Sequence, residues 1–143
     1  MAEEDWTWTL SKTFPTSKDV GHQLIEELVA ALGEAGWEGS ELFHIQMAAE
    51  EALINAVTHG NDEDETKSVQ VDFRVSPKVA WLRFTDEGPG FTPDTLPDPT
   101  ADENLESVHG RGVFLIMQMM SEVNYNDCGN EVTMIKRRQE VSA

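Results

Sequence analysis

The chain is expected to fold as a two-layer α/β sandwich with a mainly antiparallel sheet and helices on one face. Three observations predict this fold class. Two segments with a helical spacing of apolar residues lie within residues 18–60. A pair of strand-like segments joined by a short turn follows them, and a second pair closes the chain. Helices grouped beside hairpin-linked strands are typical of such sandwiches.

The first strand and the first helix are expected before residue 35. Tryptophan and leucine alternate with threonine over residues 6–10, which predicts a strand, and Pro15 ends it. Residues 16–19, Thr-Ser-Lys-Asp, place a hydroxyl three residues before a carboxylate, as in a helix-capping sequence. Apolar residues spaced four apart then predict a helix to about Gly33.

A second helix is expected to begin at Ser40, a good N-cap residue, and to reach about His59 and Gly60. Glu41 suits its first turn, because the positive end of the helix dipole favours an acidic side chain. Residues 42–57 are apolar nearly all round, which predicts that this helix is mostly buried.

The next elements form a hairpin. Residues 61–67 are an acidic turn. Apolar residues alternate with polar ones over 69–75, and a further strand-like segment covers 79–85, so a hairpin is expected around Pro77.

A long loop separates this hairpin from the end of the chain. Residues 87–110 are rich in Gly, Pro, Asp, Thr and Glu, and long loops inside compact domains are usually functional or disordered. Residues 113–120 are densely apolar and predict a buried helix. Two closing strands are expected at 123–125 and 132–135.

The charge of the chain argues against one large class of partners. Asp and Glu number 27 against 10 Lys and Arg, for a net charge of −17. Nucleic-acid affinity depends largely on cationic side chains that neutralise phosphates, so nucleic-acid binding is not expected. An acidic surface favours basic protein partners, or simply keeps a small protein soluble.

Cysteine content and the N-terminus indicate a cytoplasmic protein. The single cysteine, Cys128, excludes an intramolecular disulfide, which suits a reducing cytosol. The N-terminus is acidic where a secretory signal would be basic, and no apolar run approaches the length of a membrane span. One domain over residues 1–143, without a membrane contact, is expected.

Residues suited to chemistry occur first on the second predicted helix. Glu51 and Asn55 are four residues apart, so their side chains point the same way, one turn from each other. Glu50 lies about 100° round the helix and should not share that face. An inward-facing carboxylate and amide are costly without partners. A salt bridge, a capping contact or a bound ligand would satisfy them, and the helix alone does not distinguish these.

The second candidate segment directly follows the strand at 79–85. Asp86 can accept a hydrogen bond from an exocyclic amine, and Gly88 and Gly90 would let the backbone approach a ligand closely. An isolated D-x-G-x-G pattern is equally compatible with a plain turn.

The third candidate segment precedes the helix predicted at 113–120. Gly110 and Gly112 would expose the first N–H groups of that helix, whose dipole favours a polyphosphate, and Arg111 can contact phosphate oxygens. A flexible helix start with a solvated arginine explains the same residues.

In this order and spacing, the three segments together resemble the histidine-kinase-like (GHKL) ATPase superfamily and, within it, the anti-sigma-factor serine kinases. Residues 51–60 match the N box, E-x-x-x-N-A-x-x-H-G; residues 86–91 match the D-x-G-x-G box; residues 110–117 match the second glycine box. The resemblance implies one histidine-kinase-like ATPase domain over residues 1–143, with the Bergerat-type ATP-binding fold and an ATP lid at about 91–109.

The resemblance also implies an activity, the ATP- and Mg²⁺-dependent phosphorylation of a serine on an anti-anti-sigma partner. Glu51 would be the general base, and Asn55 would coordinate the Mg²⁺ that bridges the ATP phosphates. Asp86 would bind the adenine amino group, while Gly88 and Gly90 leave room for the base. The β and γ phosphates would be held by Gly110, Arg111 and Gly112.

Two alternatives stay open. In the first, ATP occupancy controls the affinity for partners such as a sigma factor, with little or no kinase turnover. It is favoured by the acidic surface and by Met117, Met119 and Met120, although methionines on such a helix are more often core. The second, a histidine-kinase-type catalytic domain, normally has a dimerisation helix upstream, and only short sequence precedes residue 40. A homodimer is implied by the family alone.

Overall fold

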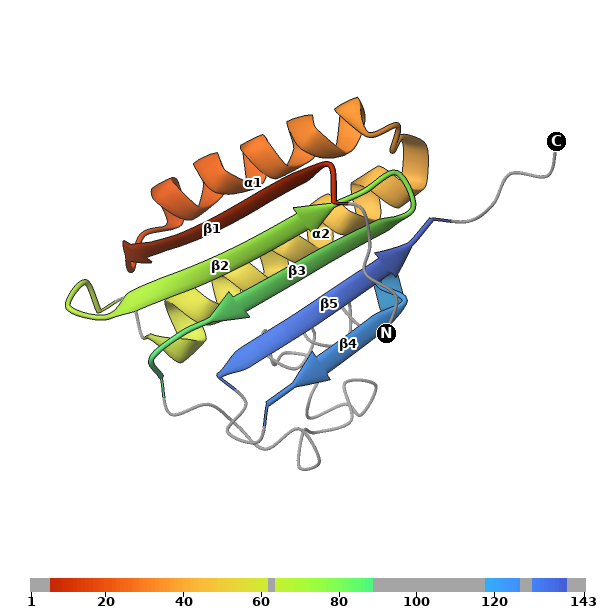
Figure 1. Cartoon of the computed structure of the whole chain (residues 1–143). Helices are drawn as coiled ribbons and strands as arrows, with labels where there is room; N and C mark the ends of the chain where they lie inside the picture. Colours follow the sequence, from red (N-terminus) through yellow and green to blue (C-terminus); the bar gives the residue numbers. More distant parts are fainter. Residues whose placement is uncertain (1–5, 62–63, 89–117, 127–129, 139–143) are drawn as a thin grey trace, which may run out of the picture.

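The computed structural model describes residues 6–61, 64–88, 118–126 and 130–138. Its elements, in chain order, are β1 (Trp8–Pro15), α1 (Lys18–Glu34), α2 (Gly39–Ile54), the π-helix η1 (Asn55–Gly60), β2 (Ser68–Val75), β3 (Val79–Thr85), β4 (Glu122–Tyr125) and β5 (Glu131–Arg137). These strands form one antiparallel sheet in the order β1-β2-β3-β5-β4. Helices α1 and α2 lie on the same face of it (Figure 1). The predicted two-layer sandwich and both predicted hairpins are confirmed.

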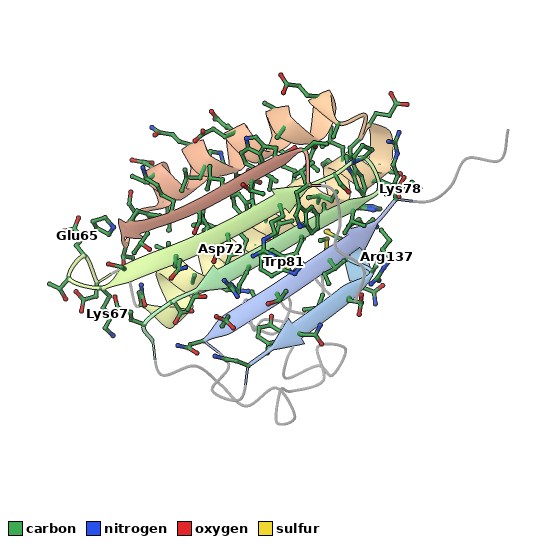
Figure 2. All side chains as sticks on the ribbon, in the orientation of Figure 1. Glu65, Lys67, Asp72, Lys78, Trp81 and Arg137 are labelled. Carbon is green, nitrogen blue, oxygen red and sulfur yellow. The ribbon has the colours of Figure 1, made fainter. Side chains whose placement is uncertain are left out.

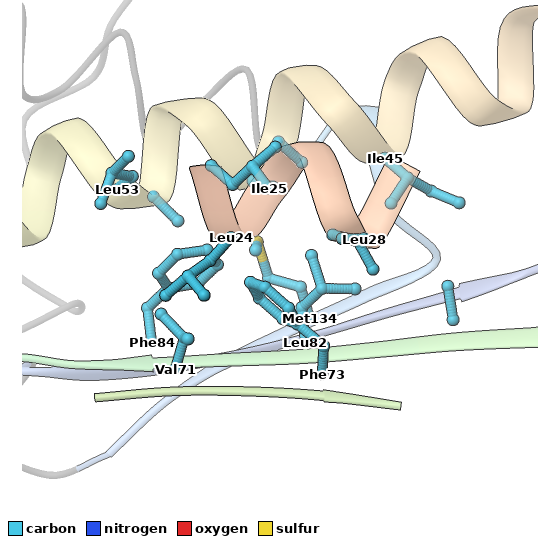
Figure 3. Packing of buried hydrophobic residues seen from close by; sticks show 14 of the residues in the cluster. Leu24, Ile25, Leu28, Ile45, Leu53, Val71, Phe73, Leu82, Phe84 and Met134 are labelled. Atoms are coloured by element: carbon cyan, nitrogen blue, oxygen red, sulfur yellow. The ribbon is translucent and has the colours of Figure 1, made fainter. Parts of the chain in front are cut away.

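The core lies between the helices and the sheet. Alternation along β2 and β3 places the apolar side chains of both strands on the helix side, because successive residues of a strand point to opposite faces. Phe73 and Phe84 meet edge to face, with ring centroids 5.6 Å apart. The side chains labelled between the layers in Figure 3 are Leu24, Ile25, Leu28, Ile45, Leu53, Val71, Phe73, Leu82, Phe84 and Met134.

The opposite face of the sheet is polar and carries Asp72 and Trp81 (Figure 2). Asp72 is only 7% exposed, and it accepts hydrogen bonds from Ser11 Oγ (2.6 Å) and from two guanidinium nitrogens of Arg83 (3.2 and 3.1 Å). The guanidinium carbons of Arg74 and Arg83 lie 4.4 and 5.2 Å from the Trp81 ring centroid. Charge-assisted hydrogen bonds thus offset the cost of burying this carboxylate.

Helix α1 begins in the predicted capping sequence. Ser17 is its N-cap, and the Ser17 hydroxyl accepts a hydrogen bond from the N–H of Val20 (3.2 Å). Thr16 has a different role, because its hydroxyl donates to the carbonyl of Lys67 (3.0 Å). The helix ends at Glu34, close to the predicted end.

The predicted N-cap of α2 is wrong, although the helix begins within one residue of the predicted start. The helix begins at Gly39, and Glu38 precedes it without a side-chain cap, so Ser40 is not the N-cap. The chain reverses through the backbone at Gly36 (φ 99°) and Gly39 (φ 65°), both in the left-handed region that favours glycine. The left-handed backbone at these two glycines sets the direction in which α2 begins.

The helical path does reach Gly60 as predicted, but its last part is not an α-helix. After Ile54 the chain continues as a π-helix over Asn55–Gly60. The N–H of Asn61 donates to the carbonyl of Ala56, five residues back, at 2.8 Å. Such segments are rare and occur frequently at functional sites.

Most of residues 87–120 cannot be compared with the predictions. The predicted lid and most of the helix predicted at 113–120 lie outside the described residues. Within the described part, Met120 is buried and Met119 packs against the core. No helix of the described ranges is long and apolar enough to cross a membrane.

Close packing between α1 and α2 predicts opposite effects for two glycines of α1. A Cβ at Gly21 would lie 2.3 Å from Cδ1 of buried Leu53, whereas a Cβ at Gly33 would meet nothing within 4 Å. Gly21→Ala is expected to lower the free energy of unfolding by about 1–2 kcal/mol, because overpacking outweighs the gain in helix propensity. Gly33→Ala should raise it by up to about 1 kcal/mol. Urea denaturation measures both, and a Gly21→Ala protein as stable as Gly33→Ala would contradict the tight contact.

Candidate functional site

Helix α2 presents different side chains to each of its neighbours. Ile45, Ala49 and Ala52 are buried in the core. Leu53 packs beside Gly21 of α1. Glu50 also belongs to the α1 side, where its carboxylate lies 3.5 Å from Nδ1 of His22. Residues of α2 that point neither into the core nor towards α1 are therefore the ones available for a ligand.

Glu51 and Asn55 lie on the flank of α2 away from α1. By the 100° step of an α-helix, their mean direction is about 150° from that of Glu50 and Leu53. Both side chains are half-buried, and neither makes a hydrogen bond with any residue that the structure describes. Since α1 lies along β1 and β2 (Figure 1), this flank faces the half of the sheet that contains β5.

A hollow of about 490 Å³ lies on the opposite flank, between α1 and α2, and is lined partly by Asp19, Glu26 and Glu50. Lys18 and His22 also line it, but the three carboxylates make it a poor site for a triphosphate. At its rim Ile54 is 37% exposed, and Phe43 further along α2 is 56% exposed, so the prediction that α2 is mostly buried fails on this outer face. The hollow is distinct from the flank of Glu51 and Asn55.

Asp86 begins the turn that follows β3, and its backbone is held from the side of β5. Its N–H donates to the carbonyl of Asn130 and its carbonyl accepts from Nδ2 of Asn130, both at 2.9 Å. Its side-chain Oδ1 accepts the N–H of Gly88 at 2.8 Å. Oδ2 has no hydrogen-bond partner among the described residues and is available to a ligand donor.

The surroundings of Asp86 act on the pKa of its carboxyl in opposite directions. Partial burial raises the pKa of the Asp86 carboxyl above its usual range. The hydrogen bond from Gly88 and the positive charge of Lys67 act in the opposite direction, with smaller effect. A carboxylate in such a place is a candidate for binding a ligand donor that replaces the lost water.

Asn61 brings these two motifs together. It caps the end of η1 and is completely buried, and its Oδ1 accepts the N–H of Glu87, the residue after Asp86, at 2.7 Å. The end of η1 and the end of β3 lie at the same end of the sandwich (Figure 1). The sequence placed Asn61 in an acidic turn. The backbone of Asn61 is right-handed (φ −87°), so the preference for asparagine at left-handed helix ends gave no signal for it.

The third motif and the lid cannot be located. Gly90, Gly110, Arg111 and Gly112 all lie outside the described residues. Within the described ranges, no cluster of three or more His, Cys, Asp or Glu side chains could hold a metal ion. The hydroxyl oxygen of Thr58, in η1, is buried without a hydrogen bond among those residues. The described residues therefore include the first motif and the start of the second, and the hydrogen bond from Glu87 to Asn61 links the turn of Asp86 to the end of η1.

Comparison with known proteins gives a consistent family. Residues 14–136 match the histidine kinase-like ATPase domain. The chain is 31% identical over 110 residues to the serine-protein kinase RsbW of Bacillus subtilis (strain 168), covering 71% of this chain and 68% of that protein. It is 24% identical over 98 residues to RsbW of Oceanobacillus iheyensis, covering 64% of this chain and 62% of that protein.

A solved structure shares the fold. The RsbU and RsbW domains of Rv1364c from Mycobacterium tuberculosis superpose with a TM-score of 0.57 at 18% identity, over 91% of this chain. This chain spans only 32% of that longer one. At this identity the likeness bears on the fold alone.

The raised pKa of Asp86 predicts a pH-dependent cost to stability. Because the folded protein holds the Asp86 proton more tightly than the unfolded chain does, its contribution to stability is present at low pH and is lost as pH rises through the folded-state pKa. Asp86→Asn should therefore gain stability relative to wild type as pH rises from about 4 to 7. Urea unfolding of the nucleotide-free proteins measures this difference, and a difference independent of pH would contradict the expectation.

Proposed function

This chain belongs to the family of histidine kinase-like ATPase domains and, within it, groups with the serine-protein kinases RsbW, and from that premise we propose that it is an ATP- and Mg²⁺-dependent protein serine kinase. It phosphorylates a serine on an anti-anti-sigma protein and acts as an anti-sigma regulatory factor. The observation that carries the proposal is the bond from Glu87 to Asn61, which joins the Asp86 turn to the helix that bears Glu51 and Asn55.

Asn55 would hold Mg²⁺ in this proposal. Its half-buried amide and the buried Thr58 hydroxyl both lack partners among the described residues, which fits a site that a ligand completes. Magnesium takes oxygen ligands and keeps several waters, so one amide oxygen with phosphate oxygens is a suitable set. The bound ion would neutralise charge on the phosphates.

Glu51 would act as the general base. Its carboxylate shares a flank with Asn55 and has no partner among the described residues, so it is available to accept a proton. The oxygen of the substrate serine forms a bond to the γ-phosphorus of ATP, and the bond from that phosphorus to the oxygen of ADP breaks. The serine proton passes to Glu51.

The neighbouring Glu50 is a poorer candidate for the base. Its carboxylate is directed to α1, 3.5 Å from Nδ1 of His22, on the opposite flank of α2 from Asn55. A proton acceptor must lie within hydrogen-bond reach of the reacting hydroxyl, so Glu50 cannot replace Glu51 in a site that contains Asn55.

The remaining groups would bind the nucleotide. Oδ2 of Asp86 would accept a hydrogen bond from the adenine amino group, beside Gly88 and Gly90. The backbone of Gly110 and Gly112, with the guanidinium of Arg111, would contact the phosphates, and the lid at about 91–109 would exclude water. One support of the ATP-gated alternative is weakened, because Met120 is buried in the core and Met119 packs against it.

Replacing the two adjacent glutamates tests the base. Glu51→Gln should slow phosphate transfer by about 10²–10⁴-fold, because the amide cannot accept the proton, while Glu50→Gln should stay within about twofold. The measurement is transfer of labelled γ-phosphate to a purified anti-anti-sigma protein from the same organism.

Each outcome of this assay decides something. Equal transfer by Glu51→Gln and wild type would remove Glu51 as the base. Absence of phosphoserine, together with a partner affinity that changes when ATP is added, would favour the ATP-gated regulator over the kinase.

The proposed recognition of adenine can be tested by replacing the hydrogen-bond acceptor of Asp86 with a donor. Because the Gly88 N–H fixes Oδ1 of Asp86, an Asp86→Asn protein would present Nδ2, a donor, to the base. Affinity for ATP should fall by about tenfold to a hundredfold, while inosine triphosphate, which carries an oxygen in place of the amino group, should bind better than ATP. Calorimetric titration of both ligands measures this, and an unchanged preference would contradict the assignment.

A further inference from the structure

Asn61 uses every polar group of its buried side chain. Its Nδ2 donates to Oγ1 of Thr16 (3.0 Å) and to the carbonyl of Ser68 (2.9 Å). Its Oδ1 accepts the N–H of Glu87 (2.7 Å). An asparagine amide has two donor hydrogens and one acceptor oxygen, so both hydrogens and the oxygen are engaged.

The backbone of Asn61 takes part as well. Its N–H donates to the carbonyl of Ala56 (2.8 Å) and closes the last turn of η1. Its carbonyl accepts the N–H of Asp64 (2.9 Å), where the chain turns towards β2. One residue therefore joins η1, the β1–α1 connection, the start of β2 and the turn after β3.

The bond to Glu87 reaches the turn that carries Asp86. The N–H of Glu87 belongs to the planar peptide unit that links it to Asp86, so holding this group orients the backbone from which the Asp86 side chain projects. Asn130 bonds the backbone of Asp86 itself: its carbonyl accepts the Asp86 N–H, and its Nδ2 donates to the Asp86 carbonyl. Two asparagines, one from each neighbouring element, thus set the direction of the Asp86 carboxylate.

We propose that Asn61 is a positioning residue that sets the Asp86–Gly88 turn relative to the helix bearing Glu51 and Asn55, and thereby sets the selectivity for adenine. This inference rests on the proposed function for its nucleotide part. Asn61 itself touches no substrate. It acts through Glu87 on Asp86, the residue that would accept the adenine amino group.

The chemistry of the position favours asparagine over its near relatives. Aspartate would place a buried carboxylate against the carbonyl of Ser68. It also has no N–H groups to donate to the Thr16 hydroxyl and the Ser68 carbonyl, as Asn61 does. Serine and alanine are too short, and have too few polar groups, to bond Thr16, Ser68 and Glu87 together. Truncation therefore leaves the Glu87 N–H without its partner at the edge of the proposed base site.

The test compares Asn61→Ala with a matched loss of one buried hydrogen bond elsewhere. Trp37→Phe removes the bond from Trp37 Nε1 to the carbonyl of Ser76 (2.9 Å), at the β2–β3 turn, the opposite end of the sandwich (Figure 1). Thr16→Val is a milder variant, for use if Asn61→Ala does not fold. It removes the hydroxyl that accepts from Asn61 Nδ2 and leaves the side-chain volume at residue 16 nearly unchanged.

The readout is the ratio of the Kd for inosine triphosphate to the Kd for ATP, since these ligands differ at the position that Asp86 would bind. Asn61→Ala should lower this ratio by about tenfold, as for one misplaced hydrogen bond to a charged group, and Thr16→Val should lower it less. Trp37→Phe should leave it within about twofold of wild type. Equal losses of affinity for both ligands in Asn61→Ala would mean a merely structural role and would overturn the inference.

Hydrogen exchange of the nucleotide-free proteins separates this inference from the proposed function. The Glu87 amide should exchange faster in Asn61→Ala, while amides at the centre of β3 keep their wild-type rates. A wild-type protein that binds neither nucleotide would refute the proposed function, and the exchange of Glu87 would still decide whether Asn61 holds the turn. Unchanged exchange at Glu87 would refute the positioning role whatever the nucleotide result.

Discussion

Helix α2 is held against the sheet and against α1 at once, and the placement of the candidate site depends on these two contacts. Small residues make both of them close: Ala49 and Ala52 are buried in the core, and Gly21 of α1 lies beside Leu53. Interiors packed at this density leave little freedom for the helix to rotate. Only one flank then remains on which a carboxylate and an amide can be both partly sheltered and available to a ligand, and Glu51 and Asn55 occupy it.

Uncharged hydrogen bonds hold the end of the sandwich beside that flank. Thr16, Asn61 and Ser68 are joined through hydroxyl, amide and backbone groups. In a chain of net charge −17, a further buried carboxylate here would be repelled as well as desolvated. Neutral groups that satisfy one another can be buried at low cost, so hydrogen bonds between them can hold the turn of Asp86 without adding a further buried charge.

Local sequence patterns predicted an element well wherever its position depended on one feature, such as a single buried face or a capping hydroxyl. Strand alternation located β2 and β3, because each strand has one face on the core. The capping sequence over residues 16–19 located the start of α1, although the N-cap is Ser17 and not Thr16, whose hydroxyl stands three residues before Asp19. The errors occur where the preference of a residue for a position, such as serine for an N-cap, conflicts with where the backbone turns. Ser40 is a good cap by composition, yet the reversal at Gly36 and Gly39 starts α2 earlier without one. Nothing in the sequence of residues 55–60 distinguishes a π-helix from a continued α-helix.

The sequence alone determined which residues are suited to chemistry, because spacing places Glu51 and Asn55 on one helical face and Asp86 at the end of a strand. It also supplied the family, through motifs that are weak singly and specific together. Only the tertiary structure decided how the segments that carry these residues are joined. Asn61 and Glu87 are 26 positions apart, and their hydrogen bond exists only after β2 and β3 have paired beneath α2. Contacts between distant segments follow from packing of the whole core, and no local pattern encodes them.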